Sequence, residues 1–229
     1  MHKKYIIIFF IFILNCCLAQ KRKTINILFD TNLNQTNLSK FQILSNGDSI
    51  QIEEFKFYIS DVLFLYNDSL LWAEKNSFHL IDFFEKETQM VSLEIPEHTL
   101  INKIKFNLGI DSITSVSGAL AGDLDPSKGM YWAWQSGYIN LKLEGTKSNC
   151  PTRKNKFQFH IGGYKQPFYA IQSITLKTKE ITNNLYIKIN LSTLFKNINF
   201  QKTHTVMIPS KEAVEFAKEI SSLFYIDEK

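Results

Sequence analysis

Segments that favour β-strands recur about every ten residues along most of the sequence, separated by clusters of Asn, Gly, Asp, Ser and Lys. The clearest segment covers residues 100–110, where Ile104, Phe106 and Leu108 alternate with lysine and asparagine. An alternation of period two places one side of a strand against a core and the other toward solvent. The sequence therefore predicts a mostly-β fold, which the 19 Phe and 9 Tyr residues also suit.

Strands are expected at residues 24–30, 55–66 with a continuation to 72, 77–84, 89–95, 100–110, 131–145, 156–162, 171–178 and 184–191, and a loop at 111–130. Residues 211–224 have helical spacing instead, with Ser210 as a reasonable N-cap. No internal repeat or linker divides the chain. We therefore expect a single-domain antiparallel β-sandwich or barrel with a short C-terminal helix, formed by residues 20–229.

The first residues have the features of a secretory signal peptide. Lys3 and Lys4 are followed by an apolar run over residues 5–14 and by small residues before Gln20. We expect residues 1–19 to be removed and the protein to be periplasmic or secreted. A lipoprotein acylated at Cys16 or Cys17 is the less favoured alternative, because a lipobox requires a small residue where Asn15 stands.

Removal of this segment restricts the chemistry of the mature chain. It leaves Cys150 without a cysteine partner, so no internal disulfide is expected. It lowers the formal net charge from +4 to +2 by taking away two lysines. No basic stripe of the kind that binds nucleic acid is present, and no later apolar stretch is long enough for a transmembrane segment.

Several families of catalytic and binding site find no support. The chain has no phosphate-binding glycine loop with lysine, no nucleophile elbow, no His-Glu-x-x-His and no Cys-x-x-Cys. No nucleophile–base pair or carboxylate dyad stands out at local spacing. We expect a binding protein and not an enzyme.

His160 is the most informative of the histidines. It lies within Phe-Gln-Phe-His-Ile, where Phe157, Phe159 and Ile161 share one side of a strand. Alternation therefore points the imidazole of His160 away from the side that packs. One interpretation is a ligand in a site; the other is a surface histidine before a turn at Gly162.

Two tryptophans share a side with polar residues in the predicted strand 131–145. If no bulge intervenes, Trp132 and Trp134 lie with Tyr138, opposite Ile139 and its alternating neighbours. They could form a second packed layer beneath the terminal helix, stack on a sugar ring, or line another kind of site.

Three further side chains are candidates for binding a metal. His79 lies in an apolar strand, where a lone histidine is more often a hydrogen-bonded core residue. His204 and Met207 carry donors that suit soft metals such as copper, although their spacing is a weak signal.

Taken in order, these residues resemble the MbnP-like copper-binding domain family of methanobactin-associated periplasmic proteins. The motifs that carry the resemblance are residues 57–62 (FYISDV), 79–83 (HLIDF), 109–112 (GIDS), 124–126 (LDP), 129–138 (GMYWAWQSGY) and 159–163 (FHIGG). The similarity runs from about residue 24 to the end of the chain. It implies a periplasmic or secreted β-sandwich.

The resemblance also implies a metal site. Better-known relatives hold Cu(I) with two histidine nitrogens and an oxygen from a tryptophan oxidised to kynurenine by a dihaem partner enzyme. His160, Trp132 and Trp134 match the shared motif, and His79 matches the form with a histidine before Leu-Ile-Asp. Trp72, Trp132 and Trp134 are all candidates for the modified residue. The chain lacks the cysteines that many members carry, which marks a divergent branch.

Two functions therefore stand at this point. The first is an exported copper-binding protein, for storage, scavenging or delivery, with His79 and His160 meeting at one metal. The second is a non-metal binding module that recognises a glycan, a peptide or an envelope protein through Trp132, Trp134 and Tyr138.

Overall fold

The computed structural model describes residues 21–33, 38–97, 99–135 and 137–228. The expected signal peptide, residues 1–19, lies outside them. The strands are β1 (Arg22–Thr31), β2 (Gln42–Ile43), β3 (Ser49–Tyr66), β4 (Ser69–Ala73), β5 (Phe78–Asp82), β6 (Met90–Pro96), β7 (Lys103–Leu108), β8 (Tyr131–Trp132), β9 (Gly137–Lys147), β10 (Lys156–Gly162), β11 (Gln172–Lys177), β12 (Asn184–Ile189), β13 (Thr205–Val206) and β14 (Phe224–Ile226). The helices are α1 (Ser112–Val116), α2 (Leu191–Asn197) and α3 (Lys211–Ser221), with short 3₁₀ turns such as η2 (Gly122–Leu124) and η3 (Pro126–Lys128).

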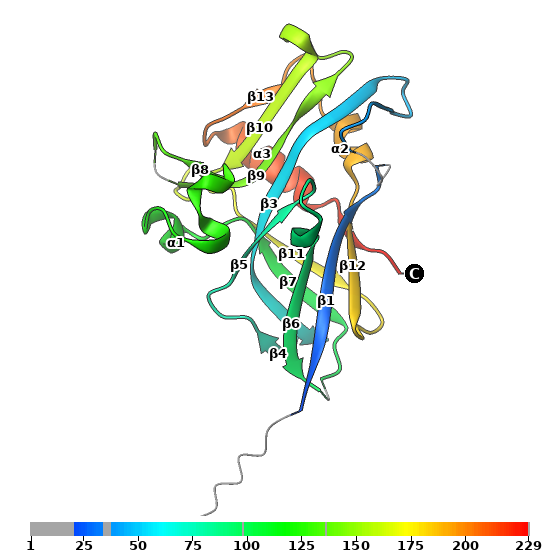
Figure 1. Ribbon diagram of the computed structural model, residues 1–229, viewed down its shortest axis with the longest axis vertical. Coiled ribbons are helices and arrows are strands. Elements are labelled where there is room, and N and C mark those ends of the chain that lie inside the picture. The colour runs from blue at the N-terminus through cyan, green and yellow to red at the C-terminus, as the bar shows by residue number, and fades with distance from the viewer. Residues whose placement is uncertain (1–20, 34–37, 98, 136, 229) are drawn as a thin grey trace, which may run out of the picture.

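The strands form two sheets that pack on each other (Figure 1). The smaller has the order β14-β12-β1-β6, and the path through the larger is β11-β7-β3-β9-β10-β13. Strands β2, β4 and β5 pair with the other edge of β3, and β8 pairs with β9. Most neighbours are antiparallel, whereas β1–β12 and β10–β13 are parallel. The mostly-β fold class expected from the sequence is confirmed.

Phenylalanine rings fill the space between the sheets. The ring of Phe29 on β1 lies 5.7 Å from that of Phe57 on β3 and 6.1 Å from that of Phe106 on β7. Phe224 on β14 contacts Phe57 at 5.6 Å. These rings are edge-on to one another, the arrangement that aromatic quadrupoles favour. The core thus lies on the face of the larger sheet that carries the apolar residues of each alternating strand.

The predicted C-terminal helix is present as α3. It begins after Ser210, whose side chain accepts a hydrogen bond from the backbone N–H of Ala213. Phe216 packs against Phe159 of β10 with ring centroids 4.7 Å apart. The helix ends before Phe224, which the sequence pattern placed on the helix and which instead lies in β14. Helix α2 was not predicted, because its seven residues are too few to show a helical period.

The predicted strand 131–145 is interrupted. Residues 133–135 form a turn between β8 and β9, and Tyr131 pairs with Tyr138 across this hairpin. The reversal of the chain breaks the alternation, so Trp132 and Trp134 have different environments. Trp132 is buried, whereas Trp134 is 62% exposed. No helix in the described part of the chain has the length and apolar character needed to cross a bilayer.

Strand β3 organises the larger sheet. Its 18 residues run nearly the full length of the molecule (Figure 1) and pair with β9 along the first half and with β7 along the second. On the core side β3 presents phenylalanines such as Phe55 and Phe57. On the other side it presents Glu54, Lys56 and Tyr58, so the larger sheet has a second face that is polar where β3 meets β9.

Candidate functional site

A row of polar residues crosses four strands on the face of the larger sheet that lies away from the core. Asp82 on β5 is paired with Lys56 on β3, Lys56 with Lys142 on β9, and Lys142 with His160 on β10. Paired residues of neighbouring strands project their side chains to the same face. The row therefore brings together residues from segments far apart in the sequence.

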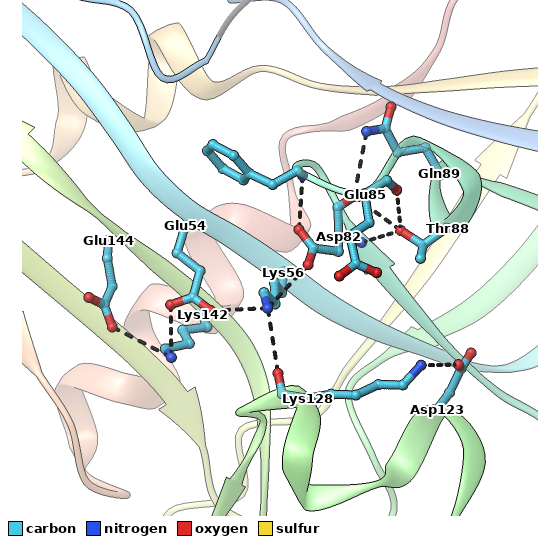
Figure 2. Close-up of polar contacts among 11 residues, drawn as sticks. Glu54, Lys56, Asp82, Glu85, Thr88, Gln89, Asp123, Lys128, Lys142 and Glu144 are labelled. Carbon is cyan, nitrogen blue, oxygen red and sulfur yellow. Dashed lines mark hydrogen bonds and ion pairs between the residues drawn. The ribbon is translucent and has the colours of Figure 1, made fainter.

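These residues form an ion-pair ladder, which we define as Asp82, Lys56, Glu54, Lys142, Glu144 and His160. Starting from Asp82, successive charged atoms along the ladder are 3.1, 3.2, 2.8, 3.7 and 2.6 Å apart. Figure 2 shows the part from Asp82 to Glu144, with Lys56 and Lys142 each between two carboxylates. Charges thus alternate in sign from Asp82 to Glu144, and the imidazole of His160 ends the ladder.

The ladder is largely shielded from water. The side chain of Asp82 is 5% exposed and that of His160 is 10% exposed. The hydrogen bond with His160 is the main cause that lowers the pKa of Glu144 to about 2, and Gln158 and Lys142 add to it against the effect of burial. Burial alone would lower the pKa of Lys56, but its contacts with Asp82 and Glu54 outweigh this and raise it. Both groups are therefore charged at neutral pH.

The ladder is joined to the segment that precedes Trp132. The ammonium group of Lys56 lies 3.5 Å from the carbonyl oxygen of Lys128, and the ammonium group of Lys128 lies 2.9 Å from Asp123 (Figure 2). Asp123 accepts a hydrogen bond from the backbone N–H of Leu80, and its carbonyl oxygen accepts one from the hydroxyl group of Tyr58. Residues 122–130 are thus fastened to β3 and β5.

Trp132 follows this segment and lies against β10. A Cβ atom added to Gly162 would lie 2.7 Å from Cζ3 of the Trp132 indole, so only a glycine permits the ring to lie there. Gly162 is two residues along β10 from His160. The ring of Trp134 lies 5.9 Å from that of Trp132. Trp132 belongs to a small apolar cluster made of Tyr58, Leu80, Ile110, Leu124, Met130, Trp132, Tyr138 and Ile139.

His79 lies on the other face of the sheet. It is paired with Ile59 of β3 and alternates with Leu80 and Asp82, so it projects toward the core side. Its Nε2 atom lies 2.9 Å from Oε2 of Glu74. Strands β5 and β10 are three strand spacings apart, about 14 Å. This corrects the expectation that His79 and His160 meet in one pocket, since the strand register separates them by face as well as by distance.

The two other predicted donors, His204 and Met207, lie just before and just after β13, the strand that pairs with β10. Thr205 and Val206 of β13 pair with Gln158 and Phe159 of β10. His204 shares its parity with the buried Val206, and its Nδ1 atom lies 3.1 Å from the carbonyl oxygen of Phe200. Met207 directly follows Val206, the last residue of β13, as His160 directly follows Phe159, the partner of Val206.

The chain beyond β13 stays close to the end of β10. A Cβ atom added to Gly163 would lie 3.3 Å from Cβ of Pro209, so Pro209 is next to the end of β10. Met207 is half-buried. We therefore group His160, Met207 and Trp132 by their places along β10 and β13, and leave His79 and His204, which project to the core side, outside this group. We call these three residues the His160 pocket.

Sequence reasoning missed the carboxylates and lysines that surround His160. The signal was present, because Glu54 and Lys56 alternate with two phenylalanines, and Lys142 and Glu144 alternate with two leucines. Within the described residues, no three His, Cys, Asp or Glu side chains gather in a way that could hold a metal ion. A metal at the His160 pocket would thus need donors of other kinds, such as the thioether of Met207.

Comparison with known proteins identifies the family to which this chain is similar in sequence and in fold. The sequence model of the family described as MbnP matches residues 22–208. The chain belongs to the MbnP family. A solved structure, MbnP from Methylosinus trichosporium, superimposes with a TM-score of 0.55 at 13% identity and covers 79% of each chain. At this identity the likeness shows a shared MbnP fold. None of the curated proteins compared with the sequence is similar to it.

The part of the chain that matches MbnP contains the complete ladder and the His160 pocket. It ends just before α3, which packs on the core face. The residues grouped on the polar face therefore all belong to the MbnP region.

Proposed function

We propose that this member of the MbnP family binds copper at the His160 pocket and acts outside the cytoplasm in copper storage, scavenging or delivery. The observation that carries the proposal is the position of His160. Its imidazole is held by a carboxylate, the buried indole of Trp132 packs against Gly162 of the same strand, and Met207 follows the strand that pairs with β10. A carboxylate bonded to the second ring nitrogen is the usual companion of a metal-binding histidine.

The donors that the pocket offers fit copper better than the other common metals. Imidazole nitrogen and thioether sulfur are borderline and soft donors, which Cu(I) accepts, whereas calcium and magnesium require oxygen ligands. Trp132 contributes an apolar wall, which limits the access of water to a bound ion. Copper is cargo in this proposal, held by the side chains of His160 and Met207.

The MbnP resemblance also suggests a partner of the tryptophan-oxidising dihaem class. Trp72 packs against Phe64 of the core at 5.6 Å, on β4, and is remote from the ladder. Of the three candidate tryptophans, we therefore propose Trp132 as the residue whose oxidation would supply an oxygen donor to the pocket. Trp134, exposed beside it, is the side chain that such a partner would meet first.

The test is the amount of copper per chain after loading the exported protein with Cu(I). We expect one ion per wild-type chain and a loss of binding in His160→Ala. The control is His204→Ala, which removes a half-buried histidine on the core side. Equal and substoichiometric copper in the wild type and His160→Ala would reject the proposal.

A non-metal binding module is the second candidate, and the exposure of Trp134 favours it. Trp132 and Tyr138 are buried, so they are not part of an accessible aromatic face. Trp134 would then be the main contact for a glycan or peptide. Binding that survives a chelator and is lost in Trp134→Ala would support this function over the first.

A further inference from the structure

We infer that Glu144 is the positioning residue of the His160 pocket: it accepts the Nε2–H of His160 and so leaves Nδ1 as the copper ligand. The inference rests on the proposed function for the identity of the ion. The position of the proton on the imidazole does not depend on copper, and it can be measured on the metal-free protein.

The contact between the two side chains is short and well placed. Oε1 of Glu144 lies 2.6 Å from Nε2 of His160. The residues occupy neighbouring strands, since Lys142 pairs with His160 and Glu144 pairs with Gln158. They are thus diagonal neighbours on one face, a separation that long side chains bridge.

The charge of Glu144 decides which ring nitrogen carries the proton. An ionised carboxylate can only accept hydrogen bonds, so the nitrogen that faces it must be a donor. A neutral imidazole has a single N–H. If that proton is on Nε2, the lone pair is on Nδ1, and only a nitrogen with a free lone pair can bind a metal.

The carboxylate itself is held from two other sides. Its Oε2 atom accepts a hydrogen bond from Nε2 of Gln158 at 3.3 Å, and Lys142 lies 3.7 Å from Oε1. Lys142 is in turn bound at 2.8 Å by Glu54 on β3. Glu144 therefore has little freedom to rotate away, and the ladder fixes the imidazole through it. This is the arrangement in which an outer carboxylate sets both the tautomer and the ring orientation of a metal ligand.

The first measurement is the tautomer of His160 in the metal-free exported protein, by nitrogen-15 NMR of labelled histidine at neutral pH. We expect the proton on Nε2 in the wild type and a mixture of tautomers in Glu144→Gln, because an amide can donate as well as accept. Glu144→Asp should restore the wild-type preference in part. The control is Glu74→Gln, which removes the matching carboxylate from His79 on the opposite face.

The second measurement is copper affinity by competition with a Cu(I) chelator. We expect Glu144→Gln to bind roughly 10–100-fold more weakly than the wild type, with Glu74→Gln unchanged.

A wild-type imidazole protonated on Nδ1 would overturn the inference whatever the copper result. So would a wild type that binds copper with the same affinity as Glu144→Gln. If the proton is on Nε2 but the wild type binds no copper, the proposed function fails and the ligand role of Nδ1 fails with it, while the Glu144–His160 contact stands.

Discussion

His160 and Glu144 are joined by a contact of 2.6 Å between neighbouring strands, and this contact is one end of a chain of ion pairs that reaches Asp82 on the far side of β3. A histidine in this position is built into the sheet. It is neither a loose surface residue nor part of the phenylalanine core. The ladder explains why so many charges are tolerated on a shielded face, since each has an opposite charge beside it.

The first prediction concerns the second donor. Replacing Met207 by leucine removes the thioether and keeps a similar volume, a change that cores usually tolerate. We expect the fold to be kept and copper affinity to fall by at least the roughly 10–100-fold that a change outside the ligand shell causes. Chelator competition measures this. An unchanged affinity would remove Met207 from the site, and Ile208→Leu, at the exposed neighbour, serves as the control.

The indole of Trp132 gives a second prediction. Gly162→Ala would place a methyl group 2.7 Å from Cζ3 of Trp132 and 2.8 Å from the carbonyl oxygen of Tyr138. Because backbone cannot move aside easily, we expect a loss of about 1–3 kcal/mol in unfolding free energy. Trp132 should also shift, which would change the near-ultraviolet circular dichroism.

The comparison for that variant is Gly47→Ala. Its Cβ atom would meet no neighbour within 4 Å, and only its positive φ of 84° resists the change. It should lower stability through the backbone alone and leave the tryptophan spectrum unchanged. Identical spectra for Gly162→Ala and the wild type would argue against the placement of the indole.

The buried end of the ladder gives a third prediction. Asp82→Ala removes the partner of Lys56 and the acceptor for the backbone N–H of Phe84. We expect urea unfolding to show a loss of roughly 2–4 kcal/mol, since a shielded lysine loses part of its compensation. Glu53→Ala, which breaks the surface pair with Lys156, should cost less than about 1 kcal/mol. Equal costs would mean that the ladder is no more important than a surface pair.

Acid should weaken the metal-free protein through Glu144. Its pKa is lowered to about 2 in the folded state from an ordinary value of 4.5. The stabilisation is complete above pH 4.5 and is lost as the pH falls toward 2, because the unfolded chain takes up the proton first. Allowing for the 20% exposure of the side chain, we expect a contribution of roughly 1–2 kcal/mol over this range. Urea unfolding at several pH values should show a smaller slope in Glu144→Gln, and a slope equal to that of the wild type would contradict this.

Alternation in the sequence was enough to predict much of the fold and the orientation of one site residue. Phe157, Phe159 and Ile161 determine the core side of β10, and they place His160 on the opposite side, as found. Helical spacing after the N-cap Ser210 likewise predicted where α3 begins. These features depend on residues within one element, where local periodicity carries the information.

What could not be predicted depends on which strands are neighbours. Residues within β5 alone do not tell which face His79 shares with His160, and only the pairing of β5 and β9 with β3 shows that the two histidines lie on opposite faces. The turn at residues 133–135 could not be predicted either, and it gives Trp132 and Trp134 different environments. The ladder is formed by residues of four strands, so no single stretch of the sequence predicts it.

X-ray absorption at the copper edge of the Cu(I)-loaded protein tests directly whether His160 and Met207 hold the ion. We expect a first shell with imidazole nitrogen and one sulfur scatterer. The nitrogen signal should be lost with the copper in His160→Ala, and the sulfur should be lost in Met207→Leu. A wild-type spectrum with two imidazoles and no sulfur, kept in Met207→Leu and abolished by His79→Ala, would contradict it.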